Sequence, residues 1–263
     1  MTILLIDLGN TALKWCLPGC EDEPHTVVHR DSIDYKAHLY EEWLSLKPTR
    51  VVGCTVAAPE IAFSMTKFFN DHDIKWEWVR PQARFICSGF SLENRYARAG
   101  QLGSDRWYAA IGAVDAIRTI SPDESLLVVQ MGTCATVDAI LNQGGGRYEF
   151  LGGRIAPGPT LMQKILADGI PALAVELGQW EAFPESTQDA LATGILDAQA
   201  GLVRLALAEL EKIAPSVRVL LSGGASSFVS ERLRTFVPNL IVRHNLVLRG
   251  LAARAAVSEW RSS

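Results

Sequence analysis

Near its start the chain holds a turn whose residue types could bind a phosphate group. The apolar residues 4–6 run directly into Asp7, and Gly9 and Asn10 follow. An ordinary hairpin explains this pattern, because Gly and Asn tolerate positive φ and would lead into a second strand at 13–16. Alternatively, the turn presents backbone N–H groups to a phosphate, with Asp7 beside it to manage a metal ion. This stretch alone leaves both interpretations open.

Two further strands end in glycine turns. LLVVQMGT at 126–133 repeats the pattern of LLIDLGNT at 4–11, since each is an apolar strand that closes on a glycine before a polar residue. A third apolar strand, VRVLLSGGAS at 217–226, ends on glycines and leads into a helix. Glycine turns at the ends of three buried strands indicate parts of one nucleotide site.

The polar residues of these turns could contact a polyphosphate. Side chains that would add hydroxyl and amide contacts are Asn10, Thr11, Thr133 and Thr136. Lys14 could neutralise phosphate charge or could simply be solvated at the end of its strand. Gly223 and Gly224 would let a base or ribose lie flat against the backbone. Neither a P-loop nor a strand-linked GxGxxG is present, so we expect the site in a cleft between two domains.

The elements that must position these turns form an α/β pattern, because short β-like runs alternate with helical patterns. The runs are 2–6, 51–56, 74–79, 126–130, 134–141, 149–156 and 217–222. One amphipathic helix is predicted over 103–119, with Trp107, Ile111, Val114 and Ile117 on one face. A longer one is predicted over about 188–213, with Ile195, Leu202, Ala206, Leu210 and Ile213 on its apolar face.

The length and the polar break after the first helix predict two domains. The chain has 263 residues, which suits one large domain or two of ordinary size. The segment SPDES at 121–125 separates the first helix from a new apolar strand. We therefore predict domains at 1–120 and 121–263.

Composition indicates a soluble protein that acts on small molecules. With 48% hydrophobic and 21% charged residues, a net charge of -4 and no long basic run, the chain lacks the positive face that nucleic acid needs. The five cysteines form no CxxC pair and mostly lie in apolar runs, which favours reduced core thiols and a cytoplasmic location. No metal-binding pattern of cysteine or histidine, no export signal and no membrane span is expected.

Five motifs resemble those of type III pantothenate kinases, which belong to the superfamily of acetate and sugar kinases, heat-shock chaperone ATPases and actin. DLGNTALK at 7–14 is similar to that family's first phosphate motif, and MGTCATVD at 131–138 to its second. LGSDRW at 102–107 resembles its catalytic stretch, GGRIAPGPTLM at 152–162 its glycine-proline segment, and NLVLRGLA at 245–252 its closing helix. The implied fold is two ribonuclease-H-like α/β domains of the actin-like ATPase superfamily with ATP in the cleft between them, paired as a homodimer.

The resemblance implies ATP-dependent phosphorylation of pantothenate to 4'-phosphopantothenate, the first step of coenzyme A biosynthesis. An alcohol needs a carboxylate to position it and take its proton, and Asp105 suits that role. The alternative for Asp105 is an N-cap of the helix at 103–119, and both roles are compatible. The residues implied to hold ATP are Asp7, Leu8, Gly9, Asn10, Thr11, Ala12, Leu13, Lys14, Thr133, Gly223 and Gly224. Asp7 would also hold Mg²⁺ through water.

The same resemblance implies a pantothenate pocket around the catalytic stretch. Its residues would be Tyr96, Gly103, Ser104, Asp105 and Arg106, with Thr187 reaching substrate from the partner subunit or nearby. Arg106 can form two hydrogen bonds to a carboxylate, which pantothenate has. Tyr96 could instead be an ordinary core aromatic.

One position departs from the family pattern in a way that bears on cofactors. Gln130 occupies the place of an aspartate that the family associates with a monovalent cation. Dependence on K⁺ or NH₄⁺, which the resemblance implies, is therefore in question for this chain.

Two other functions fit the same fold. One is a non-enzymatic, ATP-binding accessory factor for transcription, although a regulator would not need Asp105 and Tyr96 together with both phosphate turns. The other is a kinase for a different small hydroxy-acid or sugar, which would keep the chemistry and change the pocket.

Overall fold

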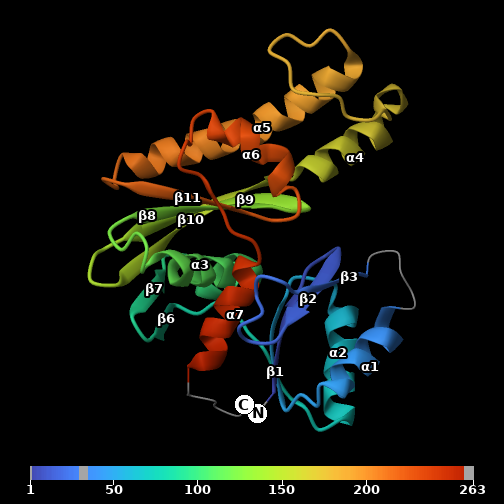
Figure 1. Ribbon diagram of the computed structural model, residues 1–263, viewed down its shortest axis with the longest axis vertical. Helices are drawn as coiled ribbons and strands as arrows, with labels where there is room; N and C mark the ends of the chain where they lie inside the picture. Colours follow the sequence, from blue (N-terminus) through green and yellow to red (C-terminus); the bar gives the residue numbers. More distant parts are fainter. Residues whose placement is uncertain (1, 30–34, 258–263) are drawn as a thin grey trace. The chain divides into compact units, whose positions relative to one another are not determined.

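The computed structural model describes residues 2–29 and 35–257, and the chain divides into two compact units (Figure 1). The first unit contains the chain up to Pro122, the segment Gln143–Glu149 and the segment that begins at Asn245. The second contains Asp123–Asn142 and Phe150–His244. The predicted junction at 120 and 121 lies near the first of these boundaries. The closing helix, which we had assigned to the second domain, instead packs within the first unit.

The first unit is built on a five-stranded sheet with the order β3-β2-β1-β4-β5. Strand β1 is antiparallel to β2 and parallel to β4, β2 is antiparallel to β3, and β4 is parallel to β5. The bounds are β1 Ile3–Leu8, β2 Ala12–Cys16, β3 His25–Val28, β4 Arg50–Thr55 and β5 Lys75–Trp78. The strands predicted at 2–6, 51–56 and 74–79 are thus confirmed, and β3 had no sequence prediction.

Alternation along β1 explains how this sheet carries both core and polar residues. Leu4, Ile6 and Leu8 pack into an apolar cluster with α1 (Tyr35–Ser45) and α2 (Pro59–Asp71). Because successive side chains of a strand point to opposite faces, Asp7 lies on the other face. The apolar run therefore buries one face while it delivers a carboxylate to the other.

Helices α3 (Ser104–Ile117) and α7 (Leu246–Ala256) pack closely against each other in the first unit (Figure 1). A Cβ added at Gly112 would overlap the carbonyl oxygen of Leu246, and one at Gly250 would overlap that of Tyr108. Close backbone approach therefore needs glycine at both positions. The helix predicted at 103–119 is confirmed, and its face of Trp107, Ile111, Val114 and Ile117 is buried.

The first unit also contains the hairpin of β6 (Arg84–Cys87) and β7 (Phe90–Asn94), and the 3-10 helix Ala99–Gln101.

The second unit is built on the strands β12-β11-β8-β9-β10 in that spatial order. Strand β8 is antiparallel to β9 and parallel to β11, which is parallel to β12. The bounds are β8 Ser125–Met131, β9 Cys134–Asn142, β10 Arg147–Pro157, β11 Val217–Ser222 and β12 Ile241–Val242. The strands predicted at 126–130, 134–141, 149–156 and 217–222 are confirmed.

Helix α5 (Thr187–Glu211) covers one face of these strands together with α6 (Ser226–Arg234) (Figure 1). Ile195, Ala206 and Leu210 are buried as predicted, whereas Ile213 follows the end of the helix and is 59% exposed. By length and composition alone α5 could cross a membrane, with a mean hydropathy of 1.3, although the sequence had suggested no such run. Half of that window is buried, and the helix contributes Leu196, Val203 and Leu210 to the core cluster, as core helices of globular proteins do.

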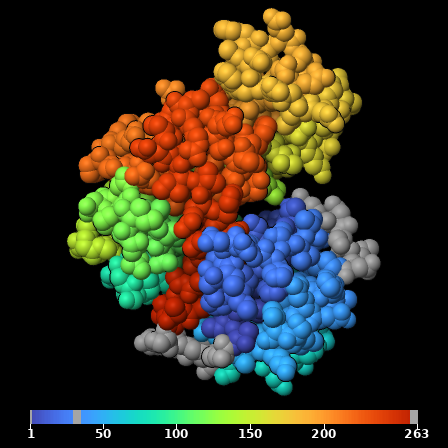
Figure 2. All heavy atoms as spheres, viewed as in Figure 1, coloured from blue at the N-terminus to red at the C-terminus, as the bar shows by residue number. Residues whose placement is uncertain are grey.

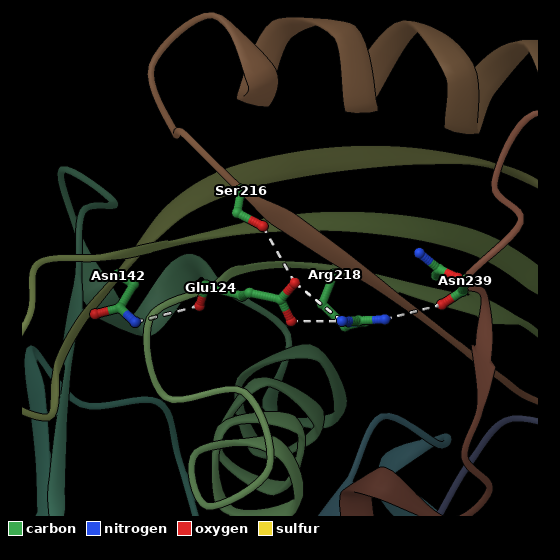
Figure 3. Close-up of polar contacts among 5 residues, drawn as sticks. All are labelled: Glu124, Asn142, Ser216, Arg218 and Asn239. Atoms are coloured by element: carbon green, nitrogen blue, oxygen red, sulfur yellow. Dashed lines mark hydrogen bonds and ion pairs between the residues drawn. The ribbon is translucent and has the colours of Figure 1, made fainter.

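A half-buried ion pair between Glu124 and Arg218 joins the strands of the second unit at the end where β8 and β11 begin (Figure 3). Arg218 donates from Nε to Glu124 Oε2 at 2.8 Å and from Nη2 to Glu124 Oε1 at 3.0 Å. Ser216 Oγ donates to the same carboxylate, Asn142 Nδ2 to the Glu124 carbonyl oxygen, and Arg218 Nη1 to the carbonyl oxygen of Asn239. This bidentate pair stabilises the register of β8 and β11 at the end opposite their glycine turns.

Candidate active site

The turn after β1 is a hairpin, as the simpler interpretation predicted. Leu8 pairs with Leu13 in register, and the N–H of Gly9 donates to the carbonyl oxygen of Ala12 at 3.1 Å. Neither Gly9 nor Asn10 has positive φ, contrary to our expectation. Leu8 and Leu13 are fully buried, so neither of these two residues, which we had predicted to contact ATP, is exposed in the structure. The Gly9 N–H is engaged within the turn, and Asn10 at its tip is exposed.

Asp7 lies on the sheet face opposite the apolar core and directly precedes this turn. Its register partner on β2 is Lys14, and Cys54 Sγ donates to its Oδ1 at 3.6 Å. The pKa of Asp7 is raised from 3.8 to about 6, mainly by burial and next by the nearby charge of Asp105, against smaller lowering effects of Lys14 and Cys54. Asp7 and Asp105, which are 98 positions apart in sequence (105 minus 7), thus share one electrostatic environment.

Asp105 stands in the first turn of α3, where helix geometry and burial act on it in opposite directions. The N-cap is Gly103, so Asp105 is not the capping residue that we had considered; its Oδ1 accepts a 2.8 Å hydrogen bond from the Arg106 N–H. Burial raises the pKa of the Asp105 carboxyl, and this outweighs the lowering by the Arg106 N–H and guanidinium. A carboxylate with a raised pKa is a better proton acceptor than an ordinary surface aspartate.

The residues before Asp105 hold the start of α3 in place. Buried Ser104 donates from Oγ to the carbonyl oxygen of Thr55, at the end of β4, at 3.1 Å. A Cβ at Gly103 would lie only 2.6 Å from Asp105 Oδ1, so glycine there lets the carboxylate lie over the backbone. Both predicted residues are therefore next to Asp105 for identifiable physical reasons.

Tyr96 and Arg106 lie side by side. Arg106 Nη1 donates to the Tyr96 hydroxyl at 3.0 Å, and its guanidinium carbon is 5.9 Å from the ring centroid. Buried Asn94 holds the loop, since its Oδ1 accepts from the Tyr96 N–H at 3.0 Å and its Nδ2 donates to the Ala99 carbonyl oxygen. The predicted pocket residues 96 and 103–106 are thus brought together in the first unit, and Tyr96 is partly exposed rather than a core aromatic.

Two contacts to the hairpin of β1 and β2 were missed by sequence reasoning. Lys14 Nζ donates to Asn245 Oδ1 at 2.9 Å, so the lysine is not merely solvated. His29, which is 6% exposed, places its ring Nε2 at 2.8 Å from the Gly9 carbonyl oxygen. The backbone N–H of His29 donates to the Thr11 carbonyl oxygen. Only the motif that contains Asn245 hinted at the first contact, and no sequence signal pointed to the second.

In the second unit, three sequence motifs meet at the ends of β8 and β11. Gly223 has φ +98, and a Cβ there would overlap the backbone of Met131. The Ala225 N–H donates to the Met131 carbonyl oxygen at 3.0 Å. The Gly158 N–H donates to the Thr133 carbonyl oxygen at 2.9 Å, which brings the glycine-proline segment onto the second phosphate motif. Gly224 is exposed, and an added Cβ there would have no atom within 4 Å.

Gln130 lies in a row of polar residues across three strands. It is in register with Thr136 on β9 and with Ser222 on β11. Thr136 and Ser222 are buried, whereas Gln130 is partly exposed. Registered side chains of neighbouring strands share one face of the sheet, so these three hydroxyl and amide groups lie together next to the glycine turns.

Thr187 is exposed and begins α5, where Ser186 is the N-cap and accepts from the Asp189 N–H. The preceding segment, 170–186, stands out from the rest of the second unit (Figure 2, yellow to gold). This segment and α4 (Pro159–Gly169) carry exposed apolar residues, namely Ile165, Ile170 and Phe183. Thr187 belongs to the second unit and Asp105 to the first, and the role of Thr187 toward substrate stays a prediction.

The cysteines are free but are not all core residues. Cys16 and Cys54 are buried and Cys87 is half-buried, whereas Cys20 and Cys134 are exposed. Cys134 lies in the second phosphate motif, where a strand begins at the surface.

Within residues 2–29 and 35–257, no group of three or more His, Cys, Asp or Glu could hold a metal ion. A single carboxylate such as Asp7 suits Mg²⁺ that is also held by phosphates, because such ions take only one or two protein carboxylates.

Comparisons with known sequences point to one family. The family model for type III pantothenate kinase matches residues 3–209. The type III pantothenate kinase of Paracidovorax citrulli is 36% identical over 264 residues, covering 97% of this chain and 98% of the relative. The enzyme of the same name from Nitrosospira multiformis is 34% identical, covering 96% and 90%.

Solved structures support the predicted fold class. A conserved protein of the Baf family of transcriptional activators from Campylobacter jejuni is similar with a TM-score of 0.54, at 22% identity and covering 94% of each chain. An archaeal actin homolog has a TM-score of 0.51, at 10% identity, covering 98% of this chain and 100% of its own. These likenesses show the fold of actin-like ATPases, which confirms the predicted class; the cleft between the domains stays a prediction.

Proposed function

Because this chain belongs to the type III pantothenate kinase family, it phosphorylates pantothenate with ATP in coenzyme A biosynthesis, and we propose that Asp105 is its general base. The observation that carries this assignment is the partly buried pair of Asp7 and Asp105, whose carboxyl pKa values are both raised. Two carboxylates in one environment allow a division of roles, in which one takes a proton and the other manages a cation.

In the proposed step, Asp105 accepts the proton of the primary hydroxyl of pantothenate as the oxygen attacks the γ-phosphorus of ATP. The new O–P bond forms while the bond from the γ-phosphorus to the bridging oxygen breaks, and ADP leaves. The Arg106 N–H bonded to Asp105 Oδ1 and the Gly103 backbone fix the direction of the carboxylate. This positioning is what the catalytic base of a phosphoryl transfer requires.

Asp7 would hold Mg²⁺ through water, and the ion would neutralise phosphate charge. Its position before the hairpin tip and its raised pKa suit a site completed by a cation. We assign phosphate contacts to Asn10, Thr11 and Lys14 in the first unit, with Gly9 and Ala12 shaping their turn. In the second unit Thr133 would contact phosphate, and Gly223 and Gly224 would lie along the adenosine.

Pantothenate would be held by Arg106, which is suited to its carboxylate, with Tyr96 alongside. The bond of 3.0 Å from Arg106 to the Tyr96 hydroxyl supports a shared pocket. Ser104 and Gly103 would line it, and Thr187 would contact substrate from the partner subunit or from nearby. A homodimer, a cytoplasmic location and a response to monovalent cations that Gln130 weakens belong to the same proposal.

The experiment that tests this function mixes purified protein with ATP, Mg²⁺ and pantothenate and measures ADP and 4'-phosphopantothenate. Turnover with pantothenate, and little with other small hydroxy-acids or sugars, is expected. Turnover confined to another hydroxy compound would favour the alternative kinase. ATP binding without turnover on any acceptor would favour the accessory factor.

A further inference from the structure

Asn245 occupies a special backbone position at the start of α7. Its φ of 56° and ψ of 36° are left-handed, a conformation that asparagine tolerates better than most residues. Its carbonyl oxygen accepts from the Arg249 N–H at 3.1 Å, so this residue also opens the hydrogen bonding of the helix. Asn245 therefore combines a left-handed backbone conformation with the first hydrogen bond of α7.

Both ends of the Asn245 side-chain amide are engaged. Oδ1 accepts from Lys14 Nζ at 2.9 Å, and Nδ2 donates to the Glu21 carbonyl oxygen at 2.9 Å. Glu21 is itself 9% exposed and its Oε1 accepts from the Gly19 N–H, which stiffens the segment after β2. An amide suits this position because it offers an acceptor to the ammonium and a donor to the carbonyl at once.

The ammonium held by Asn245 belongs to the polar face of β1 and β2. Lys14 is in register with Asp7, and its charge lowers the pKa of that carboxyl. Without a tether, a lysine side chain samples many rotamers, and ordering it on ligand binding costs free energy. A fixed ammonium would meet phosphate already oriented.

Asn245 also connects Lys14 to the helix that carries Asp105. Helix α7 packs on α3 at Gly112 and Gly250, where the two backbones touch. The position of the amide is therefore set by the same helix pair that sets the position of Asp105 in the first turn of α3.

We propose that Asn245 is a positioning residue that holds the Lys14 ammonium for the phosphates of ATP. This inference rests on the proposed function, in which Lys14 contacts phosphate. It makes the start of the closing helix part of the nucleotide site of the first unit, although Asn245 itself need not touch ATP.

The test is a double-mutant cycle read out by calorimetric titration of ATP and by thermal unfolding. Asn245→Gly keeps the left-handed backbone and removes the amide, and Lys14→Met removes the ammonium. We expect Asn245→Gly to weaken ATP binding on the order of tenfold, the usual effect of losing a hydrogen bond to a charged group. In the Lys14→Met background the same change should have little further effect. KM for pantothenate and the unfolding temperature should stay near those of the parent.

Asp73→Gly is the matched control, because Asp73 is also left-handed, with φ 55, and lies after α2. It should leave ATP affinity unchanged. If Asn245→Gly weakened ATP binding equally with and without Lys14, or left it unchanged while Lys14→Met weakened it, the positioning role would be wrong. If Lys14→Met itself left ATP affinity unchanged, the phosphate role of Lys14 would fall, and the inference with it.

Discussion

Arg106 Nη1 lies 3.0 Å from the hydroxyl oxygen of Tyr96, and the guanidinium carbon stands 5.9 Å from the centre of that ring. The tyrosine thereby limits the directions in which the guanidinium can point. A pre-oriented guanidinium suits the bidentate recognition of a carboxylate, which lysine cannot reproduce.

We therefore predict that Tyr96→Phe and Arg106→Lys each raise KM for pantothenate while KM for ATP stays near the parent value. The rise should be about tenfold for Arg106→Lys, because one charged hydrogen bond is lost. Steady-state kinetics with each substrate varied will measure it. Arg95→Lys, in an exposed neighbour paired with Glu93, is the control. Equal rises in both KM values would argue against a pocket specific for pantothenate.

Asp105→Asn is expected to lower kcat by about 10²- to 10⁴-fold, the usual effect of removing a positioned general base. The swap is nearly isosteric, and the amide oxygen can still accept from the Arg106 N–H, so fold and ATP binding should persist. Single-turnover phosphorylation of pantothenate measures the effect. Asp115→Asn, on the same helix in a surface pair with Arg118, should be silent. A rate equal to that of the parent would show that Asp105 is not the base.

The raised pKa of Asp7, about 6, predicts a pH-dependent stability in the protein without nucleotide or Mg²⁺. Between the unfolded and folded pKa values the native state binds more protons than the unfolded state, so the free energy of unfolding falls as pH rises through this window. Above it, ionised Asp7 destabilises the fold by about 2–3 kcal/mol.

Asp7→Asn should remove this penalty, so that the variant is more stable than the parent at about pH 8 and the difference shrinks towards about pH 4. Urea unfolding in the presence of a chelator will compare the two proteins at both pH values. A variant no more stable than the parent at the higher pH would contradict the assignment. Activity of the stabilised variant should be lost if Asp7 manages Mg²⁺.

The neighbouring glycines 223 and 224 allow a fold requirement to be separated from a ligand requirement. Gly223→Ala should destabilise the protein by about 1–3 kcal/mol, because φ is +98 and a Cβ would overlap the Met131 backbone. Gly224→Val should keep the stability, since an added Cβ meets no atom within 4 Å, but should weaken ATP binding. Thermal unfolding and ATP titration distinguish the two effects. Unchanged ATP affinity in Gly224→Val would remove this segment from the adenosine site.

Gln130 predicts a weaker response to potassium than in relatives that have an acid at this position. A glutamine offers a cation one neutral carbonyl oxygen, and its amide N–H end repels the ion. Its register neighbours Thr136 and Ser222 add only hydroxyl groups. Activity in sodium, potassium and ammonium chloride at matched ionic strength, for the parent and for Gln130→Asp, will test this. A steep potassium requirement that Gln130→Asp leaves unaltered would show that position 130 does not control cation use.

Local sequence predicted the longer apolar strands and the two longest helices well, whereas the short strands β3, β6, β7 and β12 had no prediction. A central strand that is buried on both faces appears in the sequence as a short continuous apolar run, such as 126–130. Such a run can be recognised without knowledge of the tertiary structure. Local sequence predicted less well where elements are short or weakly patterned. Strand β3 and helix α1 have modest apolar periodicity. Strand β3 pairs with β2, which carries Trp15, and α1 carries Trp43, and both tryptophans pack in the same core cluster. The hairpin at Gly9 was open between two interpretations, and backbone pairing supplied the geometry of the turn.

The sequence by itself therefore determined where most strands lie and which glycines follow them, because these are local patterns of burial and turn chemistry. The motif residues around Asp105 were identified by resemblance to a family. Only the tertiary structure decided what surrounds them. Lys14 meets Asn245 across 231 positions, Asp7 meets Cys54 across 47, and α7 packs on α3 where Gly112 and Gly250 allow the backbones to touch. Such pairs depend on how distant elements pack, and no periodicity within either element records the partner. The raised pKa values of the two aspartates arise from that packing alone, because burial and a neighbouring charge exist only in the folded chain.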